Sequence, residues 1–123
     1  MKNNPVGWFE IYVQDLDRAK TFYESVFQLK LEKLNTPEVA IWAFPMDMER
    51  WGAGGALVKM DGFPSGGNSV LVYFGCEDCS VEAARAVQSG GRIQREKMSI
   101  GEYGFISLVF DTEGNMIGLH SLQ

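Results

Sequence analysis

The chain has 123 residues, enough for one domain or for two small halves that share a core. Its composition, 46% hydrophobic and 22% charged, is typical of a globular protein, and its net charge of −5 argues against a nucleic-acid or anionic-membrane surface. No stretch has the length of a membrane span or the form of a secretory signal. We therefore expect a cytoplasmic location, with neither nucleic acid nor membrane as a partner.

The first half predicts a strand, a helix and three more strands. Residues 8–13 (WFEIYV) suit a strand except at Glu10, and Asp15 offers a helix cap before apolar residues recur at helical spacing up to Phe27. The three further strands are predicted at residues 30–35, 39–44 and 55–60. A loop rich in Met and Trp at residues 46–54 suits either a lid over a cavity or packing on the sheet or on a partner subunit.

The second half repeats this order. It predicts a strand at residues 69–75, a helix at 80–89 that Gly90 and Gly91 close, and strands at 92–97, 104–110 and 115–122. At an offset of about 61 or 62 positions, Trp8 falls on Ser69 and Ala56 on Gly118. We expect a single domain of two packed modules, at about 5–62 and 68–123, with a linker rich in Gly, Pro and Ser at about 61–68.

Two runs of the sequence resemble a known superfamily. VQDLDRAKTFYESVF at residues 13–27 resembles the first strand–helix junction of the vicinal oxygen chelate superfamily, which contains glyoxalases, bleomycin resistance proteins and extradiol dioxygenases. FISLVFDTEGNMIGLHS at residues 105–121 resembles its closing hairpin. The resemblance covers essentially the whole chain. It implies an α+β fold in which two tandem βαβββ modules form a curved mixed sheet that encloses a cavity.

The resemblance also implies where a metal ion would be held. Metal-dependent members place four ligands, usually His and Glu, on four strands that face the cavity. The corresponding positions here are Trp8, Ala56, Ser69 and Gly118. A divalent metal needs roughly three or four N, O or S donors, and only Ser69 offers one, a weak one. We therefore predict neither metal nor cofactor. The metal ion that glyoxalases and dioxygenases use as a Lewis acid would lack its usual ligands in this chain.

Strand alternation places a set of side chains around the predicted cavity, because every second residue points to the same face. With Trp8 facing the cavity, Glu10 and Tyr12 share its face. The predicted ligand-binding residues are Trp8, Glu10, Tyr12, Trp51, Val58, Ser69, Leu71, Tyr73, Met116 and His120. An apolar pocket with a few convergent polar groups is the usual form of a small-molecule site.

Glu10 and His120 are the candidate catalytic residues. A carboxylate beside an imidazole can act as a general acid/base pair, anchor a ligand or serve as two non-standard metal ligands. The alternative is that the two groups hydrogen-bond to each other, or are satisfied separately, and perform no chemistry.

The bleomycin-resistance branch resembles this chain in size and in lacking the metal. By this resemblance we expect a homodimer that holds a small, partly aromatic or apolar molecule in a cavity with residues from both subunits. The modules pair either within one chain or across the dimer, since both arrangements occur in the superfamily. The alternatives are a lyase or isomerase of glyoxalase type that uses Glu10 and His120, and a structural or regulatory domain with a vestigial cavity.

Cys76 and Cys79 form a CEDC motif. A structural zinc site needs a second ligand pair that the single His120 does not supply. A redox motif normally begins a helix, and Cys79 could be so placed, before the helix predicted from residue 80. The simpler interpretation is two small residues at a strand end and a helix cap. We predict no thiol chemistry.

Overall fold

The computed structural model describes residues 4–37, 39–47, 49–50 and 52–123. The first half contains β1 (Trp8–Tyr12), α1 (Leu16–Phe27), β2 (Glu32–Lys33), β3 (Ala40–Ala43) and β4 (Gly54–Lys59). The second half contains β5 (Tyr73–Gly75), α2 (Cys79–Gln88), β6 (Arg92–Ser99), a 3₁₀ turn η1 (Gly101–Tyr103), β7 (Phe105–Phe110) and β8 (Met116–Ser121). No helix among these residues is long and apolar enough to cross a membrane.

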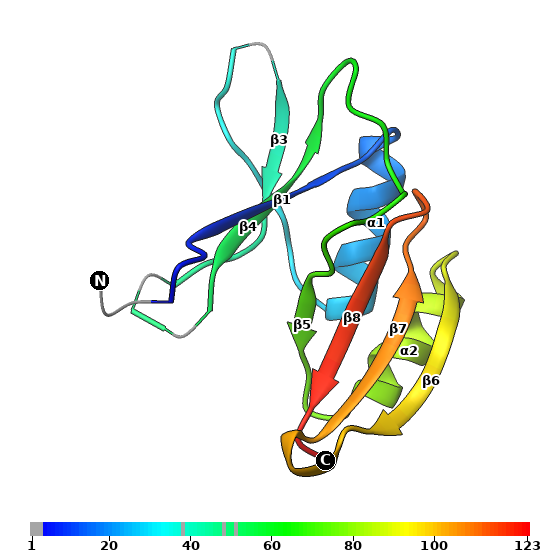
Figure 1. Ribbon diagram of the computed structural model, residues 1–123. Helices are drawn as coiled ribbons and strands as arrows, with labels where there is room; N and C mark the ends of the chain where they lie inside the picture. Colours follow the sequence, from blue (N-terminus) through cyan, green and yellow to red (C-terminus); the bar gives the residue numbers. More distant parts are fainter. Residues whose placement is uncertain (1–3, 38, 48, 51) are drawn as a thin grey trace.

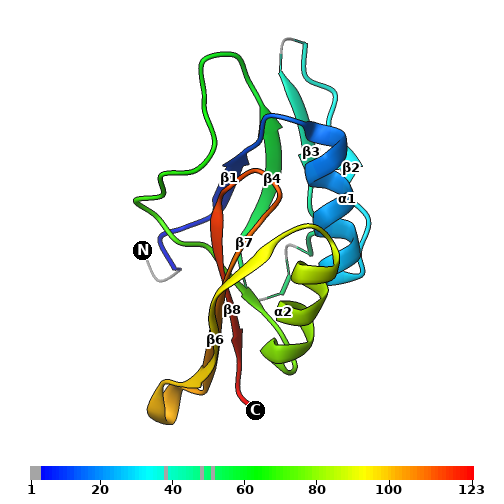
Figure 2. The same ribbon diagram turned by 90° about the vertical axis from the view of Figure 1, so that its right-hand side faces the viewer.

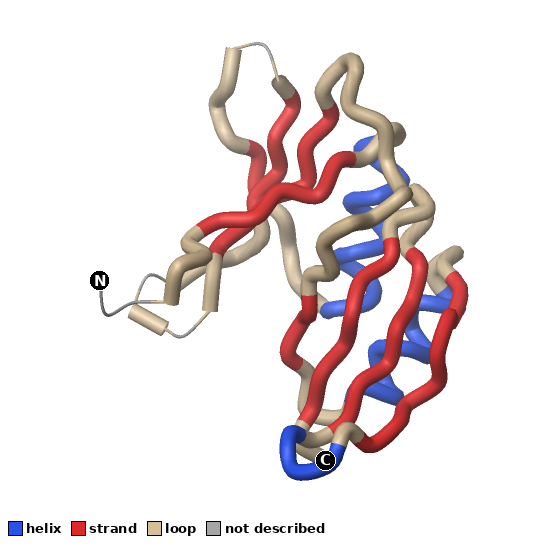
Figure 3. Tube along the Cα trace, in the orientation of Figure 1, coloured by secondary structure: helices blue, strands red, loops and turns tan. Residues whose placement is uncertain are grey.

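Each half forms one mixed sheet of four strands (Figures 1 and 3). Sheet A has the order β1-β4-β3-β2 and sheet B the order β5-β8-β7-β6, with the first and last strand of each half paired in parallel. All other pairs are antiparallel. The predicted α+β fold is confirmed.

One apolar core serves both halves. In α1, the Asp15 carboxylate caps the first turn by accepting from the Arg18 amide (3.1 Å), and the helix buries Ala19, Phe22, Tyr23 and Val26 along one stripe. This stripe joins buried residues of α2, β4, β7 and β8 in a single cluster. The two helices pack against each other and lie on the same side of the molecule (Figure 2). The opposite faces of β1 and of sheet B carry no helix, and we call them together the open face.

A polar anchor joins the two halves where the turn between β7 and β8 meets the junction of β1 and α1. Asp111 accepts from the buried Tyr23 hydroxyl (2.7 Å) and from the amides of Glu113 and Asn115 (2.8 and 2.9 Å). Asn115 Nδ2 donates to the Tyr12 carbonyl (3.0 Å). These bonds fix the start of β8 against the end of β1.

Glu113 strengthens this anchor and makes the free energy of unfolding depend on pH. Burial alone would raise the pKa of Glu113, but hydrogen bonds from the Arg18 guanidinium, from Thr112 and from two backbone amides lower it to about 2, from an ordinary value of 4.5. The unfolded chain therefore binds a proton more readily than the folded protein. The stabilisation is fully present above the unfolded pKa and is lost as the pH falls from about 4.5 towards 2.

We expect the free energy of unfolding to fall between pH 5 and pH 3 in the wild type and to fall less steeply in Glu113→Gln. Urea titrations followed by circular dichroism at several pH values measure both slopes. The variant is also expected to be less stable at pH 7, because a carboxylate with a buried side chain loses its charge-assisted bonds. Equal pH slopes in the two proteins would contradict this role of Glu113.

Two predicted strands are much shorter in the structure, and the others differ from it by one or two residues at their ends. The strand predicted at residues 69–75 begins only at Tyr73, because the Asn68 side chain takes the place of strand backbone beside β8. Its Oδ1 accepts from the Met116 amide (3.1 Å) and its Nδ2 donates to the Met116 carbonyl (2.8 Å). Ser69 and Leu71 therefore precede β5. The strand predicted at residues 30–35 is reduced to Glu32–Lys33 at the edge of sheet A.

Candidate functional site

Trp8, Glu10 and Tyr12 lie on one face of β1, as strand alternation predicts. Trp8 Nε1 donates to Glu10 Oε2 (3.2 Å), and the Tyr12 hydroxyl donates to Glu10 Oε1 (2.8 Å). Trp8 is 41% exposed and Glu10 is also exposed. The hydrogen bond to Glu10, followed by burial and by the Glu10 charge, raises the pKa of Tyr12. The phenol thus stays protonated, and the carboxylate is held between two aromatic donors in the open face.

A first pocket of about 250 Å³ lies where β1 meets the linker and the start of β8. Four of the predicted residues line it: Glu10, Tyr12, Ser69 and Met116. We call it the Glu10 pocket. Phe63 from the linker stacks on Tyr12, with ring centroids 5.0 Å apart, and so holds the linker over β1. Asn68, Val70, Val72 and Asn115 also line this pocket and were not predicted.

A second pocket of about 390 Å³ lies on sheet B, and we call it the His120 pocket. It is lined by Tyr73, Phe74, Gly75, Ile100, Ile106 and His120. His120 Nε2 lies 2.7 Å from the Tyr103 carbonyl oxygen, which can only accept, so Nε2 carries a proton and Nδ1 is the atom left for a ligand. The Tyr73 ring lies across Gly118, where an added Cβ would come within 2.3 Å of it.

Glu10 and His120 do not form the hydrogen-bonded pair that was one alternative. The Glu10 carboxylate accepts from Trp8 and Tyr12, whereas His120 binds the Tyr103 carbonyl. The two residues also line different pockets. The structure therefore places them as two separately bonded polar groups of the open face.

Three other predicted binding residues, Trp8, Val58 and Leu71, are not in these pocket walls. Val58 is buried in a small cluster with Ala43 and Ala56, against which Tyr12 packs. The Trp8 ring packs over Gly54, beside the Met46 sulfur. Leu71 is half-buried and lines neither pocket. Trp51 lies outside the described residues.

The structure corrects the offset between the two modules. The helix caps Asp15 and Asp78 are 63 positions apart, and Glu10 pairs with Ala56 as Tyr73 pairs with Gly118. The counterpart of Trp8 is therefore Leu71 and not Ser69. The two halves share few identical residues, so comparing their sequences does not reveal the correct offset. The positions of the two helix caps reveal it.

The residues present do not fit the metal site of the metal-dependent relatives. With the corrected offset, the four positions are Trp8, Ala56, Leu71 and Gly118. None of these side chains can donate to a metal, and the Tyr73 ring fills the space beside Gly118. Within residues 4–37, 39–47, 49–50 and 52–123, no group of three or more His, Cys, Asp or Glu side chains is arranged to hold a metal ion.

Sequence reasoning missed the part of the open face that β6 and β7 contribute. Ile106 lies opposite His120, and Arg95 lies opposite Leu108 on the next strand. The Arg92 guanidinium lies 3.9 Å above the Phe110 ring. The tight turn after β7 could have revealed this contribution from the sequence. Pairing Phe110 with Met116 across the turn places Ile106 opposite His120.

The CEDC motif holds two free thiols on the helix side. Cys79 begins α2, is fully buried, and its amide donates to the Ser121 hydroxyl (3.0 Å). Burial, followed by the negative charge of Glu82, raises the pKa of Cys76 to about 12. The Cys76 thiol therefore stays protonated near neutral pH, where a nucleophilic or metal-binding thiolate would be needed.

Residues 6–119 match the family model described as glyoxalase/bleomycin resistance protein/dioxygenase superfamily. No curated protein matches the chain. Among solved structures, TnmS3, an antibiotic binding protein from Streptomyces sp. CB03234, is 24% identical with a TM-score of 0.69, and the match covers 98% of both chains.

Glyoxalase I from Zea mays is 22% identical with a TM-score of 0.74, and the match covers 96% of this chain and 46% of the maize protein. The chain thus spans about half the length of that enzyme. A glyoxalase/bleomycin resistance protein from Albidiferax ferrireducens T118 is 19% identical with a TM-score of 0.64, covering 94% of this chain and 98% of that one. At these identities the likeness shows the fold.

Proposed function

Because the chain belongs to the glyoxalase/bleomycin resistance protein/dioxygenase superfamily, we propose that it binds a small, partly aromatic or apolar molecule on its open face without a metal. The observation that carries this proposal is the hydrogen-bonded array of Trp8, Glu10 and Tyr12. This array presents an indole and a carboxylate on β1. The resemblance implies that metal-dependent relatives hold their first metal-binding residue on this strand. The printed description of TnmS3 as an antibiotic binding protein supports a binding role.

The open face supplies each kind of contact that such a ligand needs. The half-exposed rings of Trp8 and Tyr73 offer flat apolar surfaces for stacking. The Glu10 carboxylate accepts hydrogen bonds from a ligand donor, and His120 Nδ1 offers a further polar contact. The His120 pocket, at about 390 Å³, has the volume of a small-molecule site, and the smaller Glu10 pocket, at about 250 Å³, lies on the same open face.

The same face supports the proposal of a homodimer. On sheet B, Tyr73 and Met98 are 47% and 38% exposed, and Ile106, Leu108 and Phe110 are only partly buried. A second copy would cover part of this apolar surface and would add its own residues to the ligand cavity. The cytoplasmic location stays a prediction from the sequence.

A lyase or isomerase of glyoxalase type remains the alternative proposal, supported by the structural likeness to maize glyoxalase I. It requires a single substrate to reach both Glu10 and His120, since the two residues line separate pockets. Full turnover of a substrate by Glu10→Gln and His120→Asn would eliminate these residues as acid and base. A structural or regulatory role without a ligand is the third possibility.

A thermal-shift screen against aromatic, cationic and aldehyde-adduct compounds tests the binding role. A ligand present at 100 times its Kd is expected to stabilise the folded protein by about 2.7 kcal/mol. Glu10→Gln is expected to weaken the affinity of that ligand about tenfold, because a hydrogen bond to a charged acceptor is lost.

The matched control is Glu32→Gln, which makes the same charge change at an exposed position on the far edge of sheet A. This variant is expected to bind like the wild type. A screen in which no compound raises the melting temperature would favour the structural or regulatory role. Equal loss of affinity in the two variants would show that only net charge matters.

A further inference from the structure

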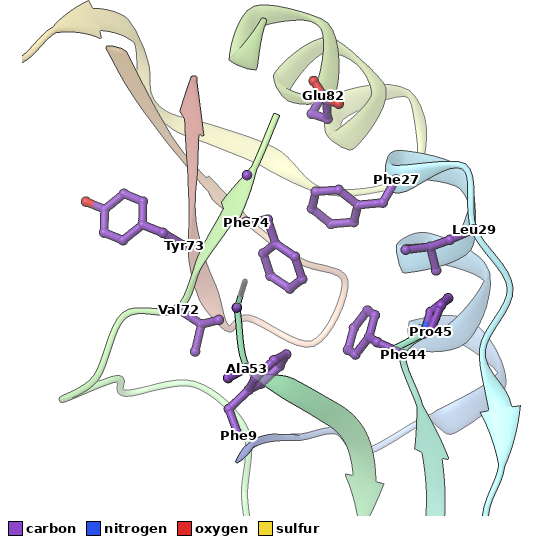
Figure 4. Close-up of a pocket in the computed structure, with 12 residues that line it drawn as sticks. Phe9, Phe27, Leu29, Phe44, Pro45, Ala53, Val72, Tyr73, Phe74 and Glu82 are labelled. Atoms are coloured by element: carbon purple, nitrogen blue, oxygen red, sulfur yellow. The ribbon is translucent and has the colours of Figure 1, made fainter. Parts of the chain in front are cut away.

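A separate cavity of about 460 Å³ lies in the seam between the modules, on the side of the helices (Figure 4). Four phenylalanine rings line it, contributed by both halves: Phe9, Phe27, Phe44 and Phe74. Neighbouring rings have centroids 4.4 to 6.2 Å apart. The only charged side chain among its lining residues in the part of the chain that the structure describes is Glu82, from α2. We call this cavity the Glu82 pocket.

Glu82 brings a carboxylate to the wall of this cavity. Its Oε1 is buried and has no hydrogen-bond partner among the residues that the structure describes. The ion pairs formed by those residues do not include Glu82. The neighbouring Cys76 thiol donates to the Phe74 carbonyl (3.6 Å). Burial, the negative charge of Glu82 and a hydrogen bond to the Glu82 carboxylate all raise the pKa of Cys76, so the thiol offers Glu82 a neutral donor and no positive charge. A carboxylate in the wall of an apolar cavity, with no cation beside it among the described residues, favours a ligand that carries a positive charge.

We propose that the Glu82 pocket binds a small organic amine in its protonated form. The ammonium group pairs with the Glu82 carboxylate, and the apolar part of the ligand lies among the phenylalanine rings. Both features of the pocket favour a cation, because an ammonium group is attracted by a carboxylate and by aromatic rings. A neutral or anionic molecule of the same shape lacks this attraction. This site lies on the helix side and shares neither Glu10 nor His120 with the open face, and Tyr73, Phe74 and Gly75 of β5 line both it and the His120 pocket.

The test is a calorimetric titration of the full chain with phenethylamine hydrochloride and with phenethyl alcohol, which has nearly the same shape but no charge. The amine is expected to bind at least tenfold more tightly than the alcohol. Glu82→Gln is expected to reduce this preference to about twofold or less. Glu32→Gln serves as the matched control and is expected to keep the full preference, because it makes the same change at an exposed position on the far edge of sheet A, outside the walls of the three named pockets.

Equal affinity for the amine and the alcohol in the wild type would overturn the proposal. A preference that disappears in Glu10→Gln and persists in Glu82→Gln would also overturn it, because the amine would then bind the open face. Since Glu82→Gln removes a half-buried carboxylate that has no cationic partner among the described residues, the unliganded variant is expected to melt near the wild-type temperature or above.

If Glu82→Gln fails to fold, Ala53→Leu tests the same site from the opposite wall. Ala53 lines the pocket and is exposed, so a larger side chain there is expected to narrow the cavity without disturbing the core. This variant is expected to weaken amine binding at least tenfold. Unchanged amine affinity in Ala53→Leu would contradict binding in the Glu82 pocket.

Discussion

Asp111→Ala is expected to destabilise the protein by about 3–5 kcal/mol at pH 7. The substitution removes the acceptor for the hydroxyl of Tyr23, a fully buried residue, and for the amides of Glu113 and Asn115. Each buried donor left without a partner costs about 1–3 kcal/mol, which water entering the vacated space partly offsets. Urea unfolding followed by circular dichroism measures the loss.

Two further variants separate the anchor from a general effect of losing a carboxylate. Asp61→Ala removes an exposed carboxylate in the linker and is expected to change the free energy of unfolding by less than about 0.5 kcal/mol. Tyr23→Phe removes one bond of the anchor and is expected to cost about 1 kcal/mol. If Asp111→Ala lies within 1 kcal/mol of the wild type, this turn does not hold the modules together.

The anchor also supports the site, because Asn115 and Met116 line the Glu10 pocket. Asn115 bonds to the Tyr12 carbonyl and accepts from the Gly66 amide (2.7 Å). Loosening the turn therefore moves one wall of the pocket together with β8.

Gly91→Ala is expected to destabilise the protein by about 3 kcal/mol or more. A Cβ at this position would lie 2.3 Å from the Phe110 carbonyl oxygen and 2.8 Å from the Phe22 ring. The first atom is backbone and the second belongs to a buried core ring, so neither can move without disturbing its element. The close approach of the chain at Gly91 lets the end of α2 pack against β7. Thermal and urea unfolding measure the effect.

Gly75→Ala is the matched control for this substitution. A Cβ at Gly75 would meet no atom within 4 Å, and its backbone does not adopt a positive φ. This variant is expected to stay within about 1 kcal/mol of the wild type, since alanine also restricts the unfolded chain. Similar losses in both variants would show that the close contact at Gly91 is not the cause.

Local patterns predicted most of the fold. The cap at Asp15, the helical spacing that follows it and the turn after Phe110 each correspond to an element in the structure. Alternation along residues 8–13 correctly placed Trp8, Glu10 and Tyr12 on one face, because the period of a strand fixes the direction of its side chains.

Features that depend on contacts between distant segments could not be predicted in this way. The side chain of Asn68 imitates strand backbone beside Met116, and no local pattern signals such a bond. The separation of Glu10 from His120 depends on how the two sheets meet. Glu82 looks like a solvated residue of an amphipathic helix, and it lines a cavity only because the seam between the modules passes beside α2.

The central claim is that the open face binds its ligand without a metal, and calorimetric titration before and after chelator treatment tests it most directly. The ligand is the compound selected by the thermal-shift screen, and the metal content of the protein is measured in parallel. We expect the same Kd before and after treatment, in protein without stoichiometric Zn, Ni, Mn or Fe. Stoichiometric metal whose removal abolishes binding, and whose return restores it, would contradict the claim.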